Sequence, residues 1–293
     1  MSAVIADSAA ASEAPVKRGF RVWLRRHPTI FFGGVVLILM AAVAVFAPWL
    51  GTTDPLALSP IRRLRQPGQE WWFGTDMLGR DVYSRVIYGT RVSLSVGLAV
   101  AVLSSVVGLA IGLVTGFVRW ADAIVMRIMD GLMSIPSVLL AIALIALTEA
   151  SLKNVIIAIT ITEVPRVVRL IRGLVLTLRE QPYVEAAVAS GTRLHRILWK
   201  HILPNTMAPL LVQATYICAS AMITEAILSF IGAGTPPNIP SWGNIMAEAR
   251  SLFQLAGYLI FFPGLFLSVT VLAVNLLGDG MRDALDPRLA RRM

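Results

Sequence analysis

Long apolar runs constrain this chain more than any other feature. A membrane-spanning helix needs about 20 consecutive apolar residues, and five segments reach or approach that length, at residues 29–50, 92–118, 132–149, 207–231 and 256–277. Only 15% of the residues are charged, against about 25% in soluble domains. A sixth segment, 153–173, is interrupted by Glu163 and Pro165. We count it because an even number of spans is needed to keep both termini on the basic side. The predicted fold is an all-α polytopic membrane protein with six transmembrane helices.

The Lys and Arg residues predict the orientation of these helices, because such residues concentrate in cytoplasmic segments. With the N-terminus in the cytoplasm, both tails and the second and fourth connections carry most of the basic residues. The two short external loops then hold only Lys153 and Arg250. The net charge of +9 therefore marks the cytoplasmic face and favours anionic membrane lipid, not nucleic acid. We expect a multi-pass protein of the bacterial plasma (inner) membrane with both termini cytoplasmic.

These expectations divide the chain into five parts. Residues 1–28 form a cytoplasmic N-terminal tail and residues 29–50 the first transmembrane helix. Residues 51–91 form a long external loop, which departs from the charge rule as long loops often do. Residues 92–278 form a core with the other five transmembrane helices, and residues 279–293 form a cytoplasmic C-terminal tail.

The stretch EAAVASGTRLHRILWKHILP, residues 185–204, lies in the largest predicted cytoplasmic connection. It starts with small residues, and Gly191 permits a sharp change of direction. One helical face then follows at the spacing of Leu194, Ile197, Leu198, His201 and Ile202. We predict a short helix, a bend and an amphipathic helix along the membrane base. From these features alone, the segment either packs under its own helix bundle or docks to a partner.

The same stretch resembles the EAA loop of the permease subunits of binding-protein-dependent ABC importers. The shared pattern is Glu-Ala-Ala, three residues, a glycine and a later Leu-Pro, and the ending RILWKHILPN is similar to the dipeptide and oligopeptide branch. Three further blocks carry the resemblance, at residues 73–97, 122–136 and 225–250. The fourth helix departs from it, because the expected Trp-Pro and Tyr-Ala-Arg are replaced by Val164-Pro165-Arg166-Val167-Val168-Arg169. Substrate choice or helix packing at that point is then open.

The resemblance implies a coupling loop, residues 183–205, whose helices insert into a groove on the ATPase. The residues carried over to this role are Glu185, Ala186, Ala187, Gly191, Leu203 and Pro204. It also implies a second homologous permease subunit, two ATP-binding subunits and an external substrate-binding protein as partners. The cycle is alternating access, and the imported ligands are peptides of the dipeptide and oligopeptide class. Nickel chelates, glutathione and other small solutes remain alternatives.

The chain itself offers no enzyme chemistry that we recognise. It lacks the G-x-x-x-x-G-K-[ST] pattern that holds nucleotide phosphates, so ATP and Mg are expected on the partner ATPase subunits. Its three histidines have no Cys or carboxylate at metal-ligand spacing, and its single cysteine, Cys218, is expected to pack as a small apolar residue. We therefore expect no catalytic, cofactor or metal site in this subunit.

Polar residues inside the predicted spans are candidates for a translocation pathway, because they usually face a bundle interior or a wet cavity. On the fifth helix these are Thr215, Ser220, Thr224 and Glu225. Interhelical hydrogen bonding is the alternative role for Glu225, and the role of Glu163 stays open. Asp130 is expected to pair with Arg127 or another basic residue, and Gly108, Gly112 and Gly116 form a ridge for close helix packing.

Two other classes of protein are alternatives to an ATP-driven permease. An ion-coupled secondary transporter would use Glu163 and Glu225, although the inverted repeat that is typical of that class is not evident. A non-transporting scaffold would only hold a complex at the membrane. The turn-rich external segments favour a binding-protein contact, and the alternative there is an interfacial role for Trp71, Trp72 and Trp242.

Overall fold

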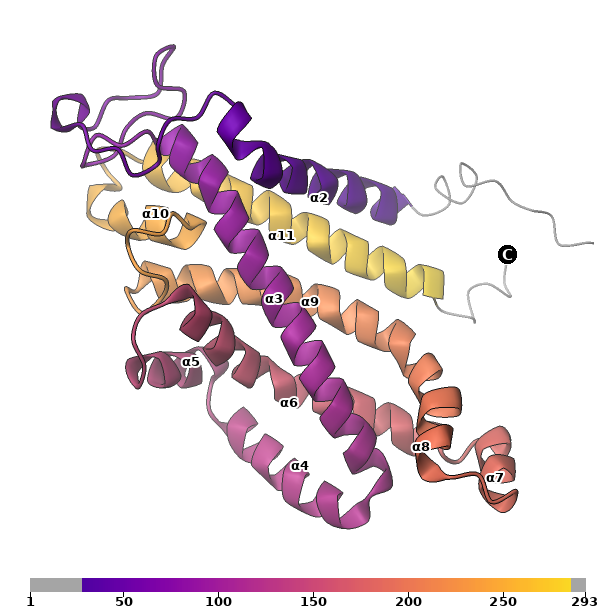
Figure 1. Cartoon of the computed structure of the whole chain (residues 1–293). Coiled ribbons are helices and arrows are strands. Elements are labelled where there is room, and N and C mark those ends of the chain that lie inside the picture. The colour runs from indigo at the N-terminus through magenta and orange to yellow at the C-terminus, as the bar shows by residue number, and fades with distance from the viewer. Residues whose placement is uncertain (1–27, 286–293) are drawn as a thin grey trace, which may run out of the picture.

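The computed structural model describes residues 28–285, and the fold is helical (Figure 1). The helices are α2 (Pro28–Phe46), α3 (Val82–Phe117), α4 (Arg119–Ser134), α5 (Ser137–Ala146), α6 (Leu152–Leu178), α7 (Pro182–Ala189), α8 (Leu194–Ile197), α9 (Leu203–Phe230), α10 (Trp242–Glu248) and α11 (Tyr258–Leu285). A short π-helical turn, η3 (Leu198–Ile202), joins α8 to α9. The predicted all-α class is confirmed.

Four stretches of helix in the described residues are long and apolar enough to cross a membrane: α2 with the turn that follows it, α3, α8 to α9, and α11. The pair α4 and α5 raises the number to five if it forms one span. Helix α6 has sufficient length but carries Glu163, Arg166, Arg169 and Arg172. The structure therefore supports a multi-pass protein with four to five candidate spans.

The predicted span at residues 132–149 is divided by a sharp bend. Helices α4 and α5 meet there at an angle of 93°, and the break falls at Ile135 and Pro136. The residue before a proline is pushed out of the α conformation by the proline ring. Ile135 accordingly adopts φ −95° and ψ 131°, so the chain turns sharply at this point.

Several helix ends differ from the predicted boundaries. Helix α3 begins at Val82, within the segment predicted as external loop, because Asp81 caps it by accepting a hydrogen bond from the Ser84 backbone N–H at 2.9 Å. Helix α11 continues to Leu285, beyond the predicted end at residue 277. Of the predicted tails, 1–28 and 279–293, residues 1–27 and 286–293 lie outside the described residues, and residues 279–285 form the end of α11.

Helix α3 is the centre of the packing and crosses the row formed by α2, α11, α9 and α6 (Figure 1). Its glycine ridge packs against α6 within this subunit. A Cβ placed on Gly108, Gly112 or Gly116 would lie only 2.4–2.7 Å from the Cβ of Val167, Ile171 or Val175, respectively. Only glycine permits such a close approach, so the ridge brings α3 and α6 together as a parallel pair.

Candidate functional site

Most of the surface of helix α7 is exposed and not covered by the other residues that the structure describes. Pro182 occupies the start of the helix, where its missing N–H costs no hydrogen bond. Val184 is buried and anchors α7 to the core. Apart from Glu185, the remaining surface is small or apolar. Its exposed residues are Tyr183, Glu185, Ala186, Val188 and Ala189, whereas Ala187 is half-buried. The result is a helix with one face fixed and one face free.

Gly191 ends this helix in the left-handed conformation, at φ +72°. The turn is closed by backbone hydrogen bonds from Gly191 N to Val188 O at 2.9 Å and from Thr192 N to Ala187 O at 3.1 Å. Glycine is favoured at such a position because it has no Cβ. A Cβ at Gly191 would meet no atom within 4 Å. The space beside the turn is therefore open, and the predicted bend is confirmed.

The helix that follows differs from the prediction in two respects. Ile197 and Ile202 are buried as the periodicity predicted, but Leu194 is exposed. The chain then runs through η3 directly into α9, so Leu203 and Pro204 begin the long helix and do not end a separate one. Proline has no N–H and clashes with the carbonyl four residues earlier. The wider turn of η3 accommodates this clash just before Pro204.

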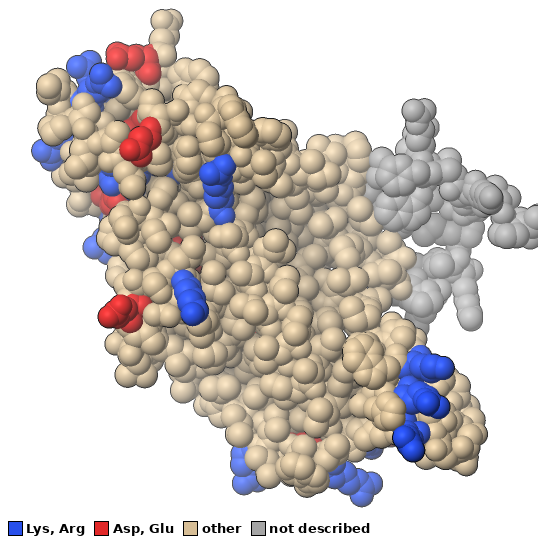
Figure 2. Space-filling model, viewed as in Figure 1, with Lys and Arg blue, Asp and Glu red and all other residues tan. Residues whose placement is uncertain are grey.

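Helices α7, α8 and η3 form one compact unit, which we call the coupling segment (residues 182–205). The rings of Tyr183 and His201 lie 6.0 Å apart, and the Asn205 side chain donates to the His201 carbonyl oxygen at 2.7 Å. Lys and Arg side chains gather over this end of the molecule (Figure 2). Those of the segment that are exposed are Arg193, Arg196 and Lys200. The segment thus combines a small, open helix face with a positively charged flank.

The four polar residues predicted for a pathway lie on α9 but do not share an open surface. Thr215 contacts α11, where a Cβ on Gly278 would lie 2.2 Å from its Oγ1. Ser220 donates to the Glu163 carboxylate of α6 at 3.2 Å. Thr224 and Glu225 are buried. Glu225 accepts from Ser229 of the same helix at 2.8 Å and from Thr235 in the loop after α9 at 3.3 Å, so these hydrogen bonds are not the interhelical ones of its alternative role.

Ion pairs connect α4 and α6, and two of the residues involved, Asp122 and Arg172, were not singled out from the sequence. Asp130 pairs with Arg169 at 2.6 Å, so its expected basic partner is on another helix. Asp122 pairs with Arg172 at 2.7 Å. Glu163 pairs with Arg166 one turn away on α6 at 3.2 Å. The signal available in the sequence was the cluster of arginines inside an otherwise apolar run.

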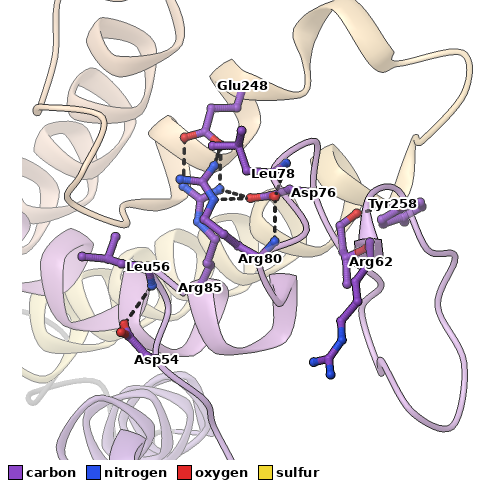
Figure 3. A network of polar contacts seen from close by, with 10 residues as sticks. Asp54, Leu56, Arg62, Asp76, Leu78, Arg80, Arg85, Glu248 and Tyr258 are labelled. Carbon is purple, nitrogen blue, oxygen red and sulfur yellow. Dashed lines mark hydrogen bonds and ion pairs between the residues drawn. The ribbon is translucent and has the colours of Figure 1, made fainter. Parts of the chain in front are cut away.

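The opposite end of the molecule is formed by residues 47–81 and 231–257, which we call the external cap after the side of the membrane that the charge pattern predicts for it. At its centre Arg85 of α3 donates to Asp76 at 2.7 Å and to the two Glu248 oxygens at 2.6 and 2.9 Å (Figure 3). Arg80 contacts the same two carboxylates. The Arg85 side chain is only 1% exposed. The sequence analysis missed this cluster, although residues 73–97 contain three of its four members.

The alternative of an interfacial role does not hold for Trp242, because its side chain is fully buried in the external cap. Its indole N–H donates to the Val86 carbonyl oxygen at 3.1 Å, which satisfies the one polar group of the ring. Tyr258 likewise ties α11 to the cap by donating to the Thr75 carbonyl oxygen at 2.9 Å. The cap is consequently a packed structure joined to α3, α10 and α11.

Comparisons with known proteins agree with this arrangement. Residues 93–291 match the family model described as "Binding-protein-dependent transport system inner membrane component". Residues 19–67 match the "N-terminal TM domain of oligopeptide transport permease C". A chain of the MetNI methionine ABC transporter, solved in inward-facing conformations, superposes with a TM-score of 0.55 at 20% identity, covering 69% of this chain and 96% of that one. At this low identity, the superposition on the MetNI chain shows similarity of the fold alone.

Three curated relatives are similar over most of their length. The "Probable peptide ABC transporter permease protein y4tQ" of Sinorhizobium fredii is 57% identical over 268 residues, 92% of each chain. The dipeptide transport system permease protein DppC of Alkalihalophilus pseudofirmus is 39% identical, over 94% of this chain and 91% of the relative. The glutathione transport system permease protein GsiD of Pectobacterium atrosepticum is 40% identical, over 94% and 92%.

These matches decide between the classes that the sequence left open. They favour a transport component over a non-transporting scaffold, and an ATP-driven permease over an ion-coupled secondary transporter. The chain belongs to the family of binding-protein-dependent transport system inner membrane components, as a multi-pass permease subunit that works with a binding protein and with separate subunits that bind ATP.

Proposed function

We propose that this chain imports peptides of the dipeptide and oligopeptide class as one of two homologous permease subunits. Support for the ligand class comes from relatives named for peptide and dipeptide transport. A relative of similar identity is named for glutathione, so glutathione is the second candidate ligand, and nickel chelates or another small solute are further alternatives. Glutathione is itself a tripeptide with a free amino group and free carboxylates. Both candidate ligands are therefore zwitterions.

The exposed face of α7 carries the proposal that the coupling segment contacts an ATPase. Glu185 and Ala186 are exposed beside the open space at Gly191, and small side chains allow another backbone to approach closely. Ala187 supports this face from its half-buried side. Leu203 and Pro204 join the segment rigidly to α9. A movement imposed on α7 by the ATPases would thus be transmitted along α9 toward the external cap.

Six transmembrane spans with both termini cytoplasmic are the topology that fits this role. Helix α6 runs parallel to α3 along the glycine ridge, and α3 is long and apolar enough to span. If α6 crosses beside α3 and the bent pair α4 and α5 forms one span, the total is six. The coupling segment then lies on the same side as the termini, where its arginines and lysine satisfy the charge rule.

The partners follow from this topology. A second homologous permease subunit would complete the pathway, two ATP-binding subunits would receive the two coupling segments, and an external binding protein would rest on the external cap. Membrane lipid surrounds the exposed apolar helix faces. Closure of the ATPases on ATP would open the pathway outward, the binding protein would release its ligand, and hydrolysis would reset the helices.

Replacement of Gly191 tests the coupling role. Gly191→Arg places a long cation in the open space beside α7, and we expect it to abolish ATP-dependent uptake and co-purification of the ATPase while membrane insertion is retained. Gly191→Asn is the matched control, because Asn tolerates positive φ more readily than other side chains, and it should retain most uptake. Normal uptake and ATPase recovery with Gly191→Arg would refute this role of the segment.

A further inference from the structure

Helix α6 carries charged residues at a depth where charges are costly. It has 27 residues, from Leu152 to Leu178, and a span needs about 20. Every window of that length within α6 includes residues 159–171. Glu163, Arg166 and Arg169 therefore lie inside the membrane if α6 crosses it at all, which rests on the proposed function.

The two arginines are not turned into the core of the subunit, although Glu163 is buried beside them. The side chains of Arg166 and Arg169 are 48% and 51% exposed, and that of Asp130, the partner of Arg169, is 60% exposed. The opposite face of α6, at Val167, Ile171 and Val175, is fully buried against α3. Elsewhere on the same bundle, exposed residues of α3 such as Val102 and Val106 are aliphatic, as contact with lipid requires. The charged side of α6 is thus unsuited to lipid.

The guanidinium groups retain hydrogen-bonding capacity. Arg166 contacts Glu163 through Nη1 alone, at 3.2 Å, and Arg169 contacts Asp130 through Nη2, at 2.6 Å. A guanidinium has five N–H donors, so each arginine keeps donors that no residue of the range 28–285 accepts. Glu163 is held in place from the other side by Ser220 of α9, at 3.2 Å.

We infer that Asp130, Glu163, Arg166 and Arg169 form a charged wall of the translocation pathway, at which Arg166 and Arg169 receive the carboxylate of the peptide in transit. The wall carries two positive and two negative groups, so it presents no net charge to a zwitterion. Exposed Asp130 is available to the peptide ammonium group. Because each arginine already has an acidic partner, its attraction for a passing carboxylate is weakened. A pathway needs such weak binding, since the ligand must also leave.

Cysteine labelling in the assembled importer tests whether the charged wall is accessible to water. In a Cys218→Ser background, Arg166→Cys and Arg169→Cys should react with a membrane-impermeant methanethiosulfonate reagent, and transported dipeptide should slow the reaction. Val106→Cys is the matched control, because Val106 is exposed at the depth of Gly108 and should stay unreactive in lipid. If both α6 cysteines are as unreactive as Val106→Cys, the face is covered by lipid or by the second permease, and the inference is overturned.

Ligand charge supplies a second readout. Arg166→Gln should lower uptake of a dipeptide with a free carboxylate by about tenfold or more, relative to uptake of the same dipeptide as its C-terminal amide. Arg166→Lys should restore part of that ratio. An unchanged ratio in Arg166→Gln would contradict carboxylate recognition. Loss of ATP dependence in the unmodified importer would contradict the proposed function instead, so the two failures can be told apart.

Discussion

The two ends of the molecule use their charged residues in opposite ways. In the external cap, Arg80 and Arg85 meet Asp76 and Glu248 inside the protein, and the pairs satisfy one another. In the coupling segment, Arg193, Arg196 and Lys200 are exposed. None of these three forms an ion pair with another residue between positions 28 and 285. Both ends are polar in sequence, and only the structure separates them.

This difference indicates what each end contributes. A buried network of charges is destabilised strongly when one partner is removed, so it holds one arrangement. Exposed charges and small side chains contribute little to the stability of their own chain, and they are free to meet another surface. The external cap is thus built as a fixed structure, and the exposed coupling segment suits the contact role proposed for it. Matched substitutions at the two ends can test this comparison.

The largest change in stability is expected for Arg85→Met. The substitution leaves Asp76 and Glu248 with Arg80 as their remaining partner, and loss of one member of a buried pair costs roughly 3–5 kcal/mol. Arg196→Met in the coupling segment is the control, because exposed substitutions usually change stability by less than about 0.5 kcal/mol. Unfolding in mixed detergent micelles measures both. Equal stability of the two variants would contradict the distinction between a fixed external cap and an exposed coupling segment.

A smaller change is expected for Asn244→Ala in the external cap. The Asn244 side chain is buried and its amide nitrogen lies 3.0 Å from the carbonyl oxygens of Pro236 and Ile239. Leaving those acceptors without a donor costs about 1–3 kcal/mol. Asn205→Ala, in the coupling segment, removes one exposed hydrogen bond to His201 and should cost less than half as much. A larger effect at Asn205 in the same unfolding assay would contradict this prediction.

The smallest change in stability is expected for Val188→Ser on the free face of α7. Its side chain is exposed, so the free energy of unfolding should change by less than about 0.5 kcal/mol. The variant should nevertheless lower the ATPase rate stimulated by the loaded binding protein, because it places a polar hydroxyl group in the proposed apolar contact between α7 and the ATPase. Val184→Ser, on the buried face, should show the reverse pattern of a clear loss of stability. Unaltered ATPase stimulation in Val188→Ser would place the contact elsewhere.

The local features of this fold could be predicted from the sequence. Apolar runs predicted α2, α3, α9 and α11, and Gly191 predicted the turn after α7. Each of these depends on residues within a few turns of one another, where periodicity and glycine content carry the information. The charge at Asp130 likewise predicted a basic partner, although not its identity.

The features that the sequence did not reveal depend on distant residues. Arg85 and Glu248 are separated by 163 positions, and nothing local to either one indicates that they meet. Burial of Trp242 also depends on α3 lying across it, and a tryptophan in a turn-rich external segment is equally typical of a membrane interface. Pro136 marks a bend between α4 and α5, and its angle of 93° is also not evident from the local sequence. The angle depends on how α4 and α5 pack against α6.

Site-directed cross-linking tests the central claim most directly, namely that the free face of α7 meets the ATPase. The chain has one cysteine, so a Cys218→Ser background allows a single cysteine at Ala189 or, as a control in the external cap, at Leu58, which is also exposed. We predict that a short bifunctional maleimide joins Ala189→Cys to the ATPase and Leu58→Cys to the binding protein or to nothing. An ATPase that co-purifies but cross-links only through Leu58→Cys, or not at all through Ala189→Cys, would contradict the account.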